Sequence, residues 1–280
     1  MYFPLRSSSL RCYLECPRKA YYSYVEGLQT MDTPSMAIGT ATHDTAAWML
    51  MREIETHALP TVEEVKDKAY DCARTIAYNV DFTSALEEKS KFEDRVIELS
   101  TQYRHEVAPW IQPLEVEASF TLEIQGLTLL GTIDVVGQDG IHETKTTRKI
   151  PPKTGDCAHR LQVGLYSLAK PGFNRATLDY LHFSERAGRA TKANAGVAHP
   201  TRTIRHLPVW IEEDDLKQEA QLALHTANYV FEQTQKGIFP RNPTSCVYWG
   251  RACRYLTICM PWRTSKAEIN VSQFTQRRTA

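Results

Sequence analysis

The sequence predicts an α/β protein in which a central mixed β-sheet is flanked by helices. A helical lobe precedes the sheet and a cysteine-rich segment follows it. Three observations predict this class: helical spacing of apolar residues dominates up to about residue 110, strand-like segments begin near 115, and a helix then separates further strands. At 280 residues the chain can bury one large core.

The N-terminal third predicts a series of helices. Ser7 to Ser9 are N-cap candidates for a first helix that runs toward Pro17. A second helix is expected over about 38–56. Apolar residues at helical spacing predict two more, over 60–81 and around 92–103.

The middle of the chain predicts strands joined by tight turns. The turns are Gln125-Gly126 and Asp139-Gly140. We expect strands at 115–124, 127–137, 140–146, 175–184 and 203–210, helices at about 156–170 and 212–236, and a mobile basic loop at 185–201. A helix between strands of one sheet indicates a mixed sheet.

Charge is segregated along the chain although the net charge is zero. Residues 144–206 contain 12 lysines and arginines against 3 acids, whereas residues 53–117 contain 7 against 15. A basic face beside an acidic lobe suits a protein that binds a polyanion on one side. Charge counts alone fit an ordinary solvated surface equally well.

The sequence shows neither a signal-peptide core at its N-terminus nor an apolar run of membrane-spanning length. We therefore expect a cytoplasmic protein without a membrane partner. In a reducing compartment, seven cysteines indicate burial or metal ligation rather than disulfides.

An acid on one predicted strand faces a Glu-x-Lys pattern on the next. Asp134 ends Gly131-Thr-Ile-Asp134, and Glu143 and Lys145 follow after the turn. Side chains alternate along a strand, so Glu143 and Lys145 point the same way, and Asp134 can reach the same place if the strands pair. Two converging carboxylates with an ammonium group suit metal-assisted hydrolysis of a phosphodiester.

Further motifs extend this pattern in a fixed order. They are Gly39-Thr-Ala-Thr-His43 upstream and Gln162-Val-Gly-Leu-Tyr166 downstream. Together, G-x-x-x-H, G-x-x-D, E-x-K and Q-x-x-x-Y resemble the PD-(D/E)XK nuclease superfamily, and within it the RecB-like exonuclease branch. The segment from Ser9 to Tyr22, with Cys16-Pro17, and the late cysteines resemble the members of that branch that carry an iron–sulfur cluster, which include CRISPR-associated RecB-like exonucleases and the AddB nuclease domain.

The resemblance implies a restriction-endonuclease-like core and a role for each motif residue. His43, Asp134, Glu143 and the backbone carbonyl of Thr144 would bind Mg²⁺ or Mn²⁺, which suit oxygen-rich sites. Lys145 would orient the attacking water. Catalytic roles are thereby expected for Asp134, Glu143, Lys145, Gln162 and Tyr166, with the last two positioning the lysine and the DNA.

His43 must be neutral to bind the metal, so activity is expected to fall on acidification through about pH 6 to 7. The sequence also departs from the family pattern. Relatives often carry an acid four residues after the motif histidine, where this chain has Ala47. The first interval of the late cysteine triplet is also wider than usual.

The cysteines divide into two sets. Cys12, Cys72 and Cys157 are expected to pack as small apolar residues. Cys16, Cys246, Cys253 and Cys259 match the iron–sulfur positions of the resemblance, and they lack the closely spaced pairs that structural Zn²⁺ prefers. A [4Fe-4S] cluster, which tolerates wider spacing, is therefore expected, with Zn²⁺ as the alternative.

The resemblance implies one nuclease domain over residues 1–263. It would comprise a helical lobe at 36–110, a core at 114–210 and an iron–sulfur region formed by 1–28 with 240–263, followed by a disordered tail at 264–280. DNA contacts are expected at Arg18, Lys19, Tyr21, Arg148, Lys149 and Arg160.

The expected function is a metal-dependent exonuclease for single-stranded DNA ends, in recombination, repair or processing. Two alternatives stay open: a flap-type endonuclease, and a non-catalytic DNA-binding scaffold of a helicase or CRISPR adaptation complex. Relatives work beside a helicase or an integrase, so a helicase, recombinase or CRISPR adaptation partner is expected as a possibility, and a homo-oligomer is also compatible with the sequence. Single-domain relatives occur in phages, for which the compartment would be the host cytoplasm.

Overall fold

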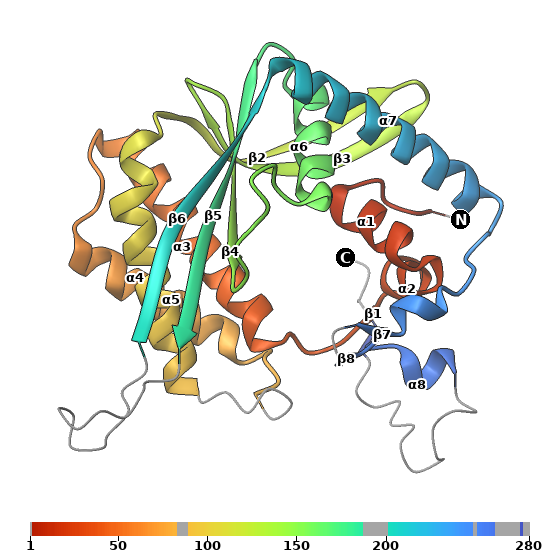
Figure 1. Cartoon of the computed structure of the whole chain (residues 1–280), viewed down its shortest axis with the longest axis horizontal. Coiled ribbons are helices and arrows are strands. Elements are labelled where there is room, and N and C mark those ends of the chain that lie inside the picture. The colour runs from red at the N-terminus through yellow and green to blue at the C-terminus, as the bar shows by residue number, and fades with distance from the viewer. Residues whose placement is uncertain (1, 83–88, 187–200, 249–250, 261–274, 277–280) are drawn as a thin grey trace.

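The structure, a computed structural model, describes residues 2–82, 89–186, 201–248, 251–260 and 275–276. A five-stranded sheet with the order β2-β3-β4-β5-β6 lies at its centre (Figure 1). β4 and β5 are parallel and the other neighbours are antiparallel, which confirms the predicted mixed sheet. The strands are β2 (Pro113–Ile124), β3 (Leu127–Gly137), β4 (Ile141–Thr147), β5 (Arg175–Arg186) and β6 (Thr201–Glu212). Residues 187–200 of the expected basic loop lie outside the described residues.

The register of the β2–β3 hairpin follows from its two-residue turn. Ile124 pairs with Leu127 across Gln125-Gly126, both of which have positive φ (51° and 79°) as such turns require. The same register runs back along the hairpin, with Val116 opposite Val135. The turn therefore decides which β2 residue faces each β3 residue.

Helix α6 (Cys157–Ala169) is the crossover that lets β4 and β5 run parallel. Helix α7 (Glu213–Gln235) packs on it. At their contact, a Cβ added to Gly164 would lie 2.3 Å from the carbonyl oxygen of Glu219. Gly164 therefore allows the two helix backbones to approach closely. Apolar residues of α6, α7 and the sheet form one buried cluster here, including Val163, Leu178 and Leu216.

The helical lobe covers part of the other face of the sheet. It consists of α3 (Pro34–Thr56), α4 (Val62–Ala77), α5 (Lys89–Glu106) and the short 3-10 helix η2 (Ala108–Trp110). Its core includes Leu50, Phe92 and Leu99, which pack with Leu181 and Phe183 of β5. α3 begins four residues before the predicted start, because Thr33 accepts a hydrogen bond from the Met36 amide and Pro34 occupies the first turn.

The two ends of the chain meet beside the sheet (Figure 1). The N-terminal part consists of α1 (Ser7–Glu15), α2 (Pro17–Ala20), the π-helix η1 (Tyr21–Val25) and β1 (Leu28–Gln29). The C-terminal part consists of η4 (Pro243–Ser245), β7 (Val247–Tyr248), β8 (Arg251–Ala252) and α8 (Leu256–Cys259). Of the expected tail, only β9 (Thr275–Gln276) is described, and it pairs with β1.

α1 ends where the chain turns toward Pro17. Cys16 is extended (φ −161°, ψ 108°), because a proline disfavours the helical conformation of the residue before it. Cys16 therefore lies at a break between two helices. None of the described helices combines the length and the apolar character that a bilayer span needs.

Candidate metal centre

His43 reaches the sheet from α3, and Gly39 makes this approach possible. A Cβ added to Gly39 would lie 3.2 Å from the Thr146 hydroxyl of β4, so a larger residue would push the helix outward. One turn further along, the His43 Nε2 atom lies 2.8 Å from Oδ2 of Asp134. The spacing of the G-x-x-x-H motif therefore serves to bring an imidazole onto the sheet.

Asp134 and Glu143 are buried acids on neighbouring strands. Asp134 is 8% exposed and Glu143 is 1% exposed. The Thr144 amide donates a hydrogen bond of 2.9 Å to Oδ2 of Asp134, which fixes that carboxylate against β4. Glu143 lies close enough to Asp134 for the charge of that carboxylate to act on it. The two strands thus bring together the acids that the sequence pattern placed on them.

Glu117 of β2 joins this group, although it belongs to none of the sequence motifs. Its Oε1 lies 3.3 Å from Nδ1 of His43, so carboxylates flank both nitrogens of the imidazole. One ligand atom each from His43, Glu117 and Asp134 lie within 4.8 Å of one another. The acid that the resemblance expected at position 47 is absent, and a carboxylate comes from β2 instead.

The position of Glu117 could have been inferred from the turn at Gln125-Gly126. A two-residue turn sets the register, and this register places Glu117 opposite Asp134, between the pairs Val116–Val135 and Ala118–Ile133. Glu117 also has φ +52°, a left-handed conformation that glutamate rarely adopts. Strained residues of this kind are concentrated at functional sites.

Lys145, Gln162 and Tyr166 surround Glu143. The Lys145 ammonium contacts Oε1 of Glu143, and the Gln162 amide donates a 2.9 Å hydrogen bond to the same oxygen. Gln162 and Tyr166, one turn apart on α6, hydrogen-bond to each other. Oε2 of Glu143 is buried and has no hydrogen-bond partner among the described residues. One oxygen of Glu143 is therefore held by two donors and the other is left for a ligand.

The charges of these groups depend on one another. Burial alone would lower the pKa of His43, but its hydrogen bond to Asp134 and the charges of Asp134, Glu117 and Glu143 raise that pKa to about 9. Burial and the neighbouring Asp134 raise the pKa of Glu143. Burial opposes ionisation of Asp134, yet His43 and Lys145 hold its pKa below the usual value. In the metal-free protein, a proton on His43 thus compensates the clustered acids.

The donor set fits a divalent cation. Carboxylate oxygens and one imidazole nitrogen suit Mg²⁺ or Mn²⁺, and the unpartnered Oε2 of Glu143 is a buried acceptor without a donor. A cation would replace the His43 proton as the positive charge between the acids. Among the described residues, the three whose ligand atoms lie close enough together to hold it are His43, Asp134 and Glu117. Glu143 and the Thr144 carbonyl, which the resemblance also expects as ligands, lie beside Asp134.

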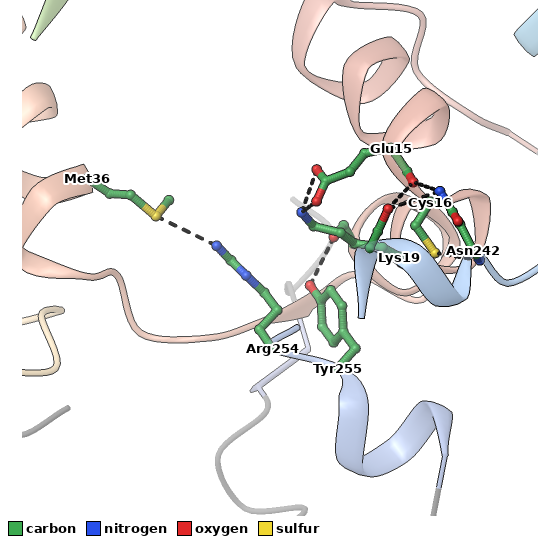
Figure 2. A network of polar contacts seen from close by, with 9 residues as sticks. Glu15, Cys16, Lys19, Met36, Asn242, Arg254 and Tyr255 are labelled. Atoms are coloured by element: carbon green, nitrogen blue, oxygen red, sulfur yellow. Dashed lines mark hydrogen bonds and ion pairs between the residues drawn. The ribbon is translucent and has the colours of Figure 1, made fainter. Parts of the chain in front are cut away.

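Four cysteines line a second, small cavity between the two ends of the chain. They are Cys16, Cys246, Cys253 and Cys259, together with Lys19, Tyr22 and Arg241 among others. The Asn242 amide donates to Sγ of Cys16 at 3.4 Å. Figure 2 shows Asn242 beside Cys16 and Arg254 directed toward Met36. Burial and the proximity of other cysteines raise the pKa values of Cys253 and Cys259.

The remaining cysteines fall into different environments. Cys12 is buried, as predicted for a packing residue, and Cys72 is half-buried against the core of the helical lobe. The prediction for Cys157 was wrong. It is exposed, because the first turn of α6 faces solvent there.

The residues expected to contact DNA are spread over several surfaces. Lys19 pairs with Glu15 at 2.8 Å, and Arg18 lies over the ring of Tyr21, whose hydroxyl donates to Glu26. The Arg148 guanidinium lies over the ring of Phe183 and the Lys149 amide bonds to Thr147. Arg160 faces α7 and makes ion pairs of 2.6 Å and 3.1 Å with Glu219 and Asp215.

Comparison with known proteins shows the family of the chain. The model of the PD-(D/E)XK nuclease superfamily matches residues 6–260. Similar solved structures include a protein from Eubacterium rectale that is provisionally named an exonuclease (12% identity, TM-score 0.48, covering 96% of this chain and 91% of that one). Another is the protein SSO0001 (12% identity, TM-score 0.25, covering 78% and 84%). A search of curated proteins finds no significant match. With 255 consecutive residues spanned by the family model, the chain belongs to the PD-(D/E)XK nuclease superfamily.

Proposed function

We propose that the protein is a divalent-metal-dependent DNA exonuclease of the RecB-like branch, with a preference for single-stranded ends and a role in DNA recombination, repair or processing. One observation carries the proposal: His43, Asp134 and Glu143 converge beside Lys145 in a chain that belongs to a nuclease superfamily. The open cavity at this site, about 470 Å³ in volume, provides room for a backbone phosphate and its sugar.

The proposed mechanism assigns a task to each side chain. A bound Mg²⁺ or Mn²⁺ would supply Lewis acidity, which activates water and neutralises charge on the phosphate. Asp134 is held by the Thr144 amide, so its carboxylate is oriented before a ligand arrives. Gln162 holds Oε1 of Glu143, so that Oε2, which has no hydrogen-bond partner among the described residues, would be available to the cation. Lys145, which contacts Glu143, orients the attacking water and offsets negative charge at the phosphorus.

Charge and aromatic content support a single-stranded substrate. The basic segment 144–206 contributes Thr144, Lys145 and Thr146 of β4 and His159 of α6 to the lining of the catalytic cavity. Tyr21 and Tyr22 offer rings for base stacking near the meeting point of the chain ends. Such surfaces bind strands through backbone charge and stacking, with little dependence on sequence.

An anaerobic assay with Mn²⁺ tests this function. Its substrates are an end-labelled linear single strand and a circular single strand of the same composition, with Asp134→Asn as the inactive control. The proposal predicts cleavage of the linear strand only. Cleavage of both strands would establish an endonuclease instead. Cleavage of neither would leave a DNA-binding scaffold.

We also propose that Cys16, Cys246, Cys253 and Cys259 hold a structural [4Fe-4S] cluster. They come from both ends of the chain and line one cavity. Their spacing in the sequence contains no C-x2-4-C pair of the kind that structural Zn²⁺ prefers, which favours the cluster over Zn²⁺.

The cluster would tie α1 to the C-terminal segment. Cys16 and Cys246 are separated by 230 positions, and a cross-link closing such a loop restrains the unfolded chain by about 5 kcal/mol. Cys259→Ala is therefore expected to remove the broad visible absorption of anaerobically purified protein and to lower its melting temperature. Cys157→Ala, outside the set, is the control. A colourless Cys259→Ala protein with unchanged stability and cleavage would refute a structural role.

A further inference from the structure

The catalytic cavity has a wall that the proposed mechanism does not use. His159, on the first turn of α6, lines the cavity with Arg11 of α1 and Lys145 of β4. It lies three residues before Gln162, so both side chains occupy the same face of the helix. The His159 side chain is 18% exposed, which leaves part of the ring accessible from the cavity.

A chain of hydrogen bonds fixes which nitrogen of His159 carries its proton. The Asp156 amide donates to the Tyr180 hydroxyl at 3.2 Å. That hydroxyl lies 2.9 Å from Nδ1 of His159. The hydroxyl hydrogen needs an acceptor, and among the described contacts of Tyr180 that acceptor is Nδ1. The imidazole hydrogen is then on Nε2. The Asp156 carboxylate lies 3.7 Å from Nδ1, too far for a hydrogen bond.

The surroundings keep this ring neutral. Burial and the positive charges of Lys145 and Arg11 lower the pKa of His159 to about 3. In this neutral form Nε2 already carries a hydrogen, and Nδ1 accepts from Tyr180. Nε2 therefore cannot take a proton from water and can only donate a hydrogen bond. His159 is therefore a fixed donor beside two cationic side chains.

We propose that Nε2–H of His159 donates a hydrogen bond to a backbone phosphate oxygen of the nucleic-acid strand, which Arg11 and Lys145 attract into the same cavity. This inference rests on the proposed nuclease function and names a substrate contact for it. Tyr180 acts as a positioning residue, because it orients the imidazole without touching the strand. The contact involves phosphate alone, so it is independent of base identity.

Two substitutions of His159 distinguish the loss of the N–H donor from a change in side-chain size. The glutamine amide in His159→Gln can occupy the place of Nε2, whereas the shorter amide in His159→Asn reaches only the place of Nδ1. The probe is a fluorescent oligothymidine, with Ca²⁺ replacing Mg²⁺ to prevent cleavage, and anisotropy gives its Kd. Loss of one hydrogen bond to a charged group should weaken binding about tenfold in His159→Asn. His159→Gln should stay near the wild type.

Further readouts keep the result interpretable. KM for Mn²⁺-dependent cleavage should rise in His159→Asn while Mn²⁺ affinity stays unchanged. Tyr180→Phe keeps the imidazole of His159 but removes the hydroxyl that orients it, so strand binding should weaken about threefold. This variant tests the contact if His159→Asn folds poorly. Wild-type binding by His159→Asn, or equal weakening in His159→Gln, would overturn the inference. If the wild type binds the strand but never cuts it, the nuclease proposal fails instead, and the binding comparison still decides the role of His159.

Discussion

Glu117 offers the sharpest test of the metal centre, because its backbone and its carboxylate can be examined separately. Its φ of +52° costs a residue with a Cβ about 1 kcal/mol relative to glycine. Its carboxylate contacts Nδ1 of His43 at 3.3 Å, where it can orient the imidazole or bind the cation itself. Glu117→Gly and Glu117→Ala both remove the carboxylate, but only glycine relieves the backbone.

The two variants should therefore agree in metal binding and differ in stability. Loss of a carboxylate that supports a metal-binding histidine weakens metal affinity by about 10- to 100-fold, so Mn²⁺ binding should fall to the same extent in both. Glu117→Gly should be more stable than Glu117→Ala by about 1 kcal/mol, or about 2 °C in melting temperature. The Glu117 side chain is 41% exposed, so its own ion pair adds little to stability.

Calorimetric titration with Mn²⁺ and thermal melts of the metal-free proteins measure these quantities. Glu123, on the same strand and away from the site, provides Glu123→Ala as the matched control. Wild-type Mn²⁺ affinity in both variants would show that Glu117 takes no part in the metal centre. If Glu117→Ala alone lost affinity, the backbone and not the carboxylate would be responsible.

Three further predictions follow from the site and the core. Lys145→Met should lower kcat by about a hundredfold or more with little change in Mn²⁺ affinity. Lys217→Met on α7 is its control, and equal losses in both would refute a specific role. A proton on His43 competes with the cation, and the raised pKa of about 9 moves this competition above the range of pH 6 to 7 expected from the sequence. Mn²⁺ affinity should therefore rise with pH up to about 9 and then level off, and a pH-independent affinity would contradict the ligand assignment. Gly164→Ala should lower the free energy of unfolding by about 2 kcal/mol in denaturant titrations, because the new methyl group meets the backbone of α7. Ser167→Ala on the same helix is the control and should cost less.

The sheet and its flanking helices were predictable because their signals are local. Alternation, tight turns and helical spacing gave the strands from β2 to β6 and the helices α3 to α7 to within a few residues. The helix α3 begins earlier than predicted, because its start is set by the Thr33 cap and Pro34 and not by apolar spacing. Exposure of Cys157 was missed, because its surroundings depend on how α6 meets solvent rather than on its neighbours in sequence.

The residues of the candidate site that belong to a sequence motif were predictable. Those whose position depends on tertiary packing were not. His43, Asp134 and Glu143 follow from motif order, and the structure places them together. Glu117 depends on hairpin register and on an unusual φ, neither of which a motif contains. His159 depends on the hydroxyl of Tyr180, 21 positions away, and on the charges of two other elements. Such contacts are set by tertiary structure.

The location of a bound cation tests the central claim most directly. Crystals soaked in Mn²⁺ and measured near the manganese absorption edge should show one anomalous peak in contact with Nε2 of His43 and the carboxylates of Asp134 and Glu143. The same peak should be missing from Asp134→Asn crystals soaked in the same way. A manganese peak elsewhere on the chain, with His43 still bonded to Asp134, would contradict the assignment of this site as the metal centre.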